Sequence, residues 1–120
     1  MSAPLGRALS ATLSSVPSQS IAVLENAQLT EAALRDAAQR AGMTVVAAAS
    51  HQFTPCGASC VLILEQSHFA CHTWPEKCAL TVSIHACSHT ADTQIRTALG
   101  ALATALSVPE NAARFAFFSH

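Results

Sequence analysis

The sequence is poor in charge and contains no tyrosine. Only 11% of its 120 residues are charged, and the formal net charge is −1. Binding of nucleic acid through phosphates needs a field of Lys and Arg, which six scattered basic residues do not supply. Disordered chains combine low hydrophobicity with high net charge, whereas 51% of this sequence is hydrophobic. We therefore expect a folded domain with no nucleic-acid partner.

Long apolar runs are absent as well. Residues 44–49 and 60–64 are among the longest, and a bilayer span needs about 20 residues. The first twenty residues hold one basic side chain, Arg7, and no apolar segment of the signal-peptide kind, so we expect no targeting signal. These features predict a cytoplasmic protein without a membrane partner.

The length of the chain predicts one domain over residues 1–120. The surplus of apolar over charged residues is large for such a small chain. It predicts that part of the surface is buried against a second subunit, most simply in a homodimer.

The cysteines do not form an obvious disulfide or zinc framework. Their number is odd, and the spacings lack the two compact ligand pairs that are typical of structural zinc. We expect reduced thiols, most of them buried as small apolar side chains, and no bound metal. The five cysteines are Cys56, Cys60, Cys71, Cys78 and Cys87.

Hydrophobic periodicity predicts six strands and two helices. The residues of Lys77–Cys87 alternate, so that Leu80, Val82 and Ile84 share one face and Cys87 lies on the polar face. The six predicted strands are Leu5–Leu13, Met43–His51, Ser59–Gln66, Phe69–Trp74, Lys77–Cys87 and Ala112–Phe118.

The first predicted helix begins after an N-cap at Thr30 and ends at Gly42. Its apolar face is predicted to hold Ala32, Ala33, Ala37, Ala38 and Ala41. The second begins after a cap at Thr90 or Asp92 and buries Ile95, Leu99, Leu102 and Leu106. The order β-α-β-β-β-β-α-β predicts an α+β fold, a two-layer α/β sandwich whose two helices pack on one face of an antiparallel sheet.

The segment 67–76 gathers most of the groups that are able to do chemistry. It holds a hydroxyl, two imidazoles, a thiol, an indole and a carboxylate within ten positions. Ser67 and His68 are adjacent, and adjacent strand side chains point to opposite faces, so this pair alone is weak evidence for a nucleophile and its base. Taken singly, Trp74 also suits a core or an interface, and Glu76 also suits a solvated turn. The residues by themselves indicate only a polar site.

The segment Ser67-His-x-x-x-His-Thr-Trp-Pro-Glu76 resembles the signature of the short prokaryotic S-adenosylmethionine decarboxylases, which depend on a pyruvoyl group. The resemblance extends to the segment 51–59, similar to the family's H-x-F-x-P-x-G-x-S pattern. Downstream, Cys87 matches the family's cysteine, and Leu5-Gly6-Arg7 looks like its opening strand. The similar region covers most of residues 5–90.

This resemblance implies a proenzyme that processes itself. Ser67 would attack the carbonyl of Gln66, and elimination from the resulting ester would split the chain into a β chain of residues 1–66 and an α chain of residues 67–120. The α chain would then begin with a covalent pyruvoyl group derived from Ser67. By the family pattern Ser59 and His72 assist this processing, with His72 as the base.

The resemblance also implies roles in the mature enzyme. The pyruvoyl group would form a Schiff base with S-adenosylmethionine and accept the electrons left by CO2, which yields an aminopropyl donor for spermidine synthesis. Cys87 resembles the family's proton donor and Phe53 the aromatic that stacks on adenine. Glu76 resembles the carboxylate that accepts the ribose hydroxyls, and Trp74 of the same signature is expected to line the substrate site.

Three residues depart from the family pattern. Gln66 replaces the usual glutamate before the nucleophile, Ser83 replaces an aspartate, and Ser88 replaces the glycine after the cysteine. Two alternatives therefore stay open. One is a pyruvoyl decarboxylase of the same fold that acts on ornithine or arginine, and the other is an unprocessed paralogue that regulates an active partner.

Overall fold

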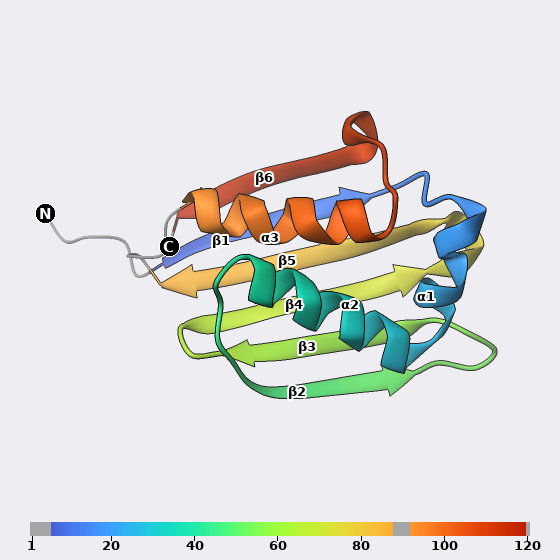
Figure 1. The fold of residues 1–120 in the computed structure, drawn as a ribbon, viewed down its shortest axis with the longest axis horizontal. Helices are drawn as coiled ribbons and strands as arrows, with labels where there is room; N and C mark the ends of the chain where they lie inside the picture. Colours follow the sequence, from blue (N-terminus) through green and yellow to red (C-terminus); the bar gives the residue numbers. More distant parts are fainter. Residues whose placement is uncertain (1–5, 88–91, 120) are drawn as a thin grey trace, which may run out of the picture.

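Six antiparallel strands form one sheet in the order β2-β3-β4-β5-β1-β6 in a computed structural model that describes residues 6–87 and 92–119 (Figure 1). The predicted strand start at Leu5 and the predicted cap at Thr90 lie outside those residues. The observed strands are β1 Gly6–Leu13, β2 Val45–Gln52, β3 Ala58–Leu64, β4 Ser67–Trp74, β5 Ala79–Cys87 and β6 Ala113–Ser119. All six predicted strands are thus present, with shifts of up to two residues at most ends.

Two long helices, α2 (Ala27–Arg40) and α3 (Asp92–Ala105), lie side by side on one face of the sheet (Figure 1). This arrangement confirms the predicted α+β sandwich. None of the described helices is long and apolar enough to cross a membrane.

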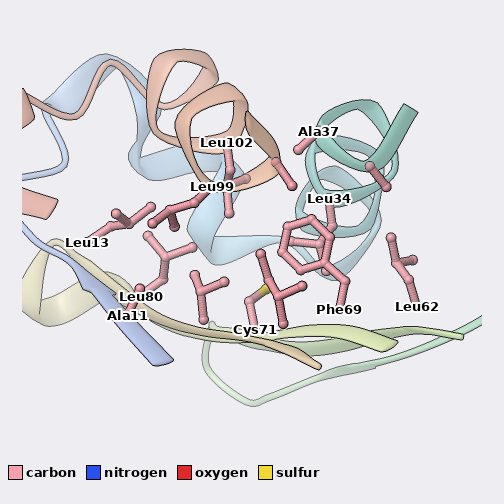
Figure 2. Close-up of a cluster of buried hydrophobic side chains, with 14 of the residues drawn as sticks. Ala11, Leu13, Leu34, Ala37, Leu62, Phe69, Cys71, Leu80, Leu99 and Leu102 are labelled. Carbon is pink, nitrogen blue, oxygen red and sulfur yellow. The ribbon is translucent and has the colours of Figure 1, made fainter. Parts of the chain in front are cut away.

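The core fills the space between the sheet and these helices. Phe69 of β4 and Leu34 of α2 are both fully buried there (Figure 2). Strand β5 alternates as predicted, because Leu80, Val82 and Ile84 are buried while the residues between them are not. The four residues predicted to be buried along the second helix are all buried, and the last of them lies one residue past the end of α3: Ile95, Leu99, Leu102 and Leu106.

The start of α2 corrects two predictions. Its N-cap is Asn26, whose side chain accepts a hydrogen bond from the backbone N–H of Leu29 at 3.0 Å. Thr30 lies inside the helix and donates its hydroxyl to the carbonyl of Val23 at 2.7 Å. Ala32 is exposed, because the buried stripe at helical spacing runs through Leu34, Ala37 and Ala38 instead.

A short helix, α1 (Ile21–Glu25), was not predicted, since five residues are too few to display a helical period. Two further expectations were also inexact. A 3-10 turn at Pro75–Lys77 delays the start of β5 to Ala79. Only Cys60 and Cys71 are buried, whereas Cys78 is exposed and Cys56 and Cys87 are half-buried, so the prediction that most of the thiols are buried was wrong.

Candidate active site

The face of the sheet opposite the helices carries a broad hollow of about 570 Å³. Strand side chains alternate, so the residues between the core positions point to this face. Its wall is mostly small or polar and comes from five adjacent strands. Among the residues that line it are Ser10, His51, Ser59, Ala70, His72 and Ser83.

An aromatic cluster, here Phe53, Ser59, His72 and Trp74, stands where β4 ends. The Ser59 hydroxyl lies 2.6 Å from Nδ1 of His72, because these two residues pair directly across β3 and β4. The His72 ring lies between those of Phe53 and Trp74, with ring centroids 5.3 Å and 4.6 Å away. Phe53 is 38% exposed and Trp74 40% exposed, so both rings are open to a ligand. Glu76 follows Trp74 by two residues and is exposed in the 3-10 turn.

Two side chains that the sequence did not single out hold this end of the sheet in place. The Gln52 amide donates to the carbonyls of Glu25 and Gly57 at 2.8 Å and 3.0 Å. Thr73 is buried, donates to the carbonyl of Leu24 and accepts from the N–H of Ala58. The loop that carries Phe53 is therefore tied to the helical layer. Both residues lie inside the segments that carry the family resemblance, but residue type and spacing gave no reason to assign them a role.

A hairpin cluster, here Gln66, Ser67, His68, His85 and Cys87, stands at the other end of β4. Strands β3 and β4 are joined by the two residues 65 and 66, and Ser67 follows with φ +132°. A serine rarely adopts this conformation, so the backbone is strained at this residue. The carbonyl of Gln66 accepts a hydrogen bond from the backbone N–H of Cys87 at 3.3 Å.

The Cys87 thiol is part of the same cluster. Its Sγ lies 3.3 Å from Oε1 of Gln66 and donates a hydrogen bond to it. Gly6 of β1 pairs with Cys87, and a Cβ on this glycine would lie 2.6 Å from the carbonyl oxygen of Ala86. The close approach of β1 therefore requires glycine, and it fixes the end of β5 from which Cys87 projects.

Ser67 and His68 are in contact, contrary to the expectation from strand alternation. The hydroxyl of Ser67 lies 3.4 Å from Nδ1 of His68. The positive φ of Ser67 rotates this residue out of the regular strand pattern, which removes the basis for placing the two side chains on opposite faces. The His68 ring in turn meets the edge of the His85 ring at 5.3 Å between centroids.

The two clusters do not meet within one chain. His72 is the fifth residue after Ser67 along extended β4, which corresponds to a span of about 17 Å at the usual rise of a strand. The predicted site residues are thus divided. Gln66, Ser67 and Cys87 lie at one end of β4, and Phe53, Ser59, His72 and Trp74 lie at the other.

The cysteines differ in their ionisation. Burial raises the pKa of the Cys71 thiol to about 12, and burial raises that of Cys60 to about 11. These two thiols stay neutral in the core at ordinary pH. All five cysteines are among the described residues, and none of them forms a disulfide. Within the part of the chain that the structure describes, no three His, Cys, Asp or Glu side chains gather as a metal site would require.

A family model described as S-adenosylmethionine decarboxylase matches residues 12–114 of the sequence, which include both clusters. The chain belongs to the S-adenosylmethionine decarboxylase family. This match confirms the family resemblance that residues 51–59 and 67–76 carry.

Individual relatives support the same family assignment. The S-adenosylmethionine decarboxylase proenzyme of Thermotoga petrophila is 37% identical over 70 residues, which are 58% of this chain and 54% of the relative. The proenzyme of Pseudomonas paraeruginosa is 35% identical over 68 residues, 57% of this chain and 42% of the relative. The chain spans about half the length of the curated relatives it matches.

A solved structure covers the fold more completely. The adenosylmethionine decarboxylase of Aquifex aeolicus superposes with a TM-score of 0.80 and 26% identity, over 99% of this chain and 91% of that one. The whole two-layer sandwich, with both ends of β4, is therefore similar to that decarboxylase.

Proposed function

We propose that the chain cleaves itself between Gln66 and Ser67 and then decarboxylates S-adenosylmethionine. The observation that carries the proposal is the geometry of this peptide bond. Its carbonyl accepts a hydrogen bond from the N–H of Cys87 at 3.3 Å, and the hydroxyl beside it belongs to a residue with strained φ. A donor on the carbonyl oxygen stabilises the negative charge that develops there during attack. Ester formation at Ser67 also releases the local strain.

The residues present fit a pyruvoyl group at position 67. Elimination from the ester leaves Gln66 as the new carboxyl terminus of the β chain and a dehydroalanine at position 67. Tautomerisation of this residue to an imine, followed by hydrolysis with water and release of ammonia, gives the α chain its pyruvoyl terminus. The pyruvoyl group supplies an electron sink for loss of CO2 from the bound amino acid. Cys87 lies at the same end of the sheet and donates the proton that the product carbon needs.

The aromatic cluster supplies the substrate site. Phe53 and Trp74 offer exposed ring faces to the adenine and to the sulfonium cation, and aromatic faces attract cations. Glu76 accepts hydrogen bonds from the ribose hydroxyls. In processing, His72 takes the α-proton of the ester, held in position by Ser59 at 2.6 Å. The decarboxylated product then serves as an aminopropyl donor for spermidine.

A homodimer joins the two clusters. A two-fold axis parallel to the sheet, running between the open faces of the two protomers and crossing over β4 near Ala70, exchanges the two ends of β4, so that Ser67 of one protomer meets the partner's His72. The open face around Ala70 suits such an interface, because its hollow is lined by small residues. Each active site then uses residues of both protomers. The cytoplasmic location stays a prediction.

The experiment combines intact mass under denaturing conditions with release of CO2 from three substrates. We expect two fragments, residues 1–66 and a pyruvoyl-blocked 67–120, and CO2 from S-adenosylmethionine. Release from ornithine or arginine instead would reassign the substrate. One uncut chain after prolonged incubation would contradict the pyruvoyl proposal and favour a regulatory paralogue.

A further inference from the structure

The hairpin cluster contains a base that the family pattern does not assign. Self-cleavage needs two proton transfers, one from the Ser67 hydroxyl as it attacks and one from the α-carbon as the ester eliminates. The proposed roles cover only the second, through His72. Within its own chain His72 is about 17 Å of strand away from the attacking hydroxyl.

Among the described residues, His68 is a titratable side chain in contact with that hydroxyl. Its Nδ1 lies 3.4 Å from Oγ of Ser67, slightly longer than a good hydrogen bond. Catalytic hydrogen bonds are often long in the resting state and shorten as the reaction begins. Imidazole accepts a proton near neutral pH, which a base for a serine hydroxyl requires.

The neighbours of His68 keep its ring beside Ser67. His68 pairs with His85 across β4 and β5, and the two rings meet edge to face at 5.3 Å between centroids. Ser67 itself pairs with Ala86, next to the Cys87 N–H that holds the Gln66 carbonyl. Three adjacent residues of β5, residues 85–87, thus position the His68 ring, the Ser67 hydroxyl and the donor to the Gln66 carbonyl.

We propose that His68 is the general base for the attack of Ser67 on Gln66, an inference that rests on the proposed self-cleavage. His68 Nδ1 takes the hydroxyl proton while Oγ forms a bond to the carbonyl carbon of Gln66. The carbon–nitrogen bond then breaks, and the departing amine of Ser67 takes the proton back from His68. An amide becomes an ester without water, oxidant or reductant, and His68 returns to its starting form.

The roles of His68 and His72 can be distinguished by the intermediate that accumulates when each of them is substituted. We would follow wild-type, His68→Ala, His68→Gln and His72→Ala chains by intact mass during cell-free synthesis, and treat each with hydroxylamine, which cleaves esters. His68→Ala and His68→Gln are expected to slow cleavage at least about 100-fold, within the usual contribution of a general base. Their uncut chains should resist hydroxylamine, because they stop as amides. His72→Ala should stop as an ester that hydroxylamine cleaves.

Added imidazole gives an independent readout. It should accelerate His68→Ala several-fold and leave the wild type unchanged, because only the variant has room for a replacement base. His85→Phe keeps an aromatic edge against His68 and removes the second imidazole, so it should slow cleavage far less than His68→Gln, because His85 only positions the His68 ring. Glutamine is similar in size to histidine and position 68 lies on the open face, so His68→Gln is expected to fold. Its melting temperature is compared with that of the wild type.

Several results would overturn the assignment. His68→Gln that is folded and cleaves at the wild-type rate removes the role of His68. His68 variants that accumulate a hydroxylamine-sensitive ester place His68 in elimination instead, and a 100-fold loss in His85→Phe moves the base to His85. A wild-type chain that never cleaves contradicts the proposed function itself, and this result is distinct from all the others.

Discussion

The two ends of β4 are built on different principles. At the aromatic cluster, regular strand pairing places Ser59 opposite His72, and side-chain hydrogen bonds from Gln52 and Thr73 tie the surrounding loop to the helices. At the hairpin cluster, a two-residue turn and a serine at positive φ break the regular pattern. The first end is suited to hold a ligand in place, and the second is suited to change covalently.

In the proposed homodimer, each active site takes the reacting bond from one protomer and the ligand-holding rings from the other. If the reacting bond and the ligand-holding rings lie at opposite ends of one strand, neither protomer is complete alone. The following predictions test that division, from the largest expected effect to the smallest.

Ser67→Ala and His72→Ala should each abolish decarboxylation when expressed alone, the first for lack of a hydroxyl and the second for lack of elimination. Co-expression should restore activity, because a mixed dimer contains one site with both Ser67 and His72. Random pairing makes half of the dimers mixed, so about a quarter of wild-type CO2 release is expected. Zero recovery in dimers shown by mass to be mixed would mean that each chain forms its own site.

Cys87→Ala should leave cleavage intact and lower decarboxylation on the order of 100-fold or more, because the proton donor acts only after CO2 is lost. The backbone N–H that holds the Gln66 carbonyl is unchanged in this variant. Intact mass measures cleavage and CO2 release measures turnover. An equal loss of both would show that the thiol is structural.

Phe53→Leu should raise the KM for S-adenosylmethionine about tenfold, since stacking of a base on an aromatic ring contributes about 1–3 kcal/mol. Cleavage and kcat should change little, because Phe53 lies in the aromatic cluster, remote from Ser67 along β4. Steady-state kinetics on the processed enzyme separate these quantities. If the KM were unchanged and self-cleavage were slower, Phe53 would act in processing and not in substrate binding.

The smallest expected effect concerns Cys71, in the middle of β4, and the dependence of the free energy of unfolding on pH. Unfolded thiols ionise near pH 8.5, whereas burial raises the pKa of Cys71 to about 12 in the folded chain. Because the folded pKa is raised, the contribution to stability is complete below about pH 8.5 and is lost as the pH rises from there towards 12. The free energy of unfolding should fall by about 1–2 kcal/mol by pH 10 for this thiol.

Urea unfolding at several pH values measures this loss. The Cys71→Ala variant should show a shallower alkaline decline than the wild type, whatever its stability at pH 7. Identical slopes in the two proteins would mean that Cys71 ionises as readily in the folded state as in the unfolded one.

Some of these features are predictable from sequence because they depend on local periodicity. The alternation in β5 predicts which of its residues face the helices, and the leucine spacing in α3 predicts its buried stripe. The N-cap of α2 is harder to predict from the sequence, because Thr30 and Asn26 are both good capping residues. Only the contact of Thr30 with the Val23 carbonyl, across the end of α1, favours the earlier start.

For the candidate site too, some features are predictable from the sequence and others are not. The spacing of Ser59, Ser67, His72 and Cys87 carries the family resemblance without any structure. The contact between Ser67 and His68 is invisible in that spacing, because strand alternation predicts that neighbours diverge. A single dihedral angle, φ of +132° at Ser67, reverses this prediction.

The sequence by itself therefore determined the class of the fold, the covered face of the sheet and the set of candidate site residues, since each follows from residue type and spacing along one element. The tertiary structure decided which of those residues lie in the hairpin cluster and which lie in the aromatic cluster. Pairing of β4 with β3 places His72 beside Ser59, and pairing with β5 places Ser67 beside the Cys87 N–H. Register between strands depends on contacts between distant segments, and spacing along one strand does not encode it.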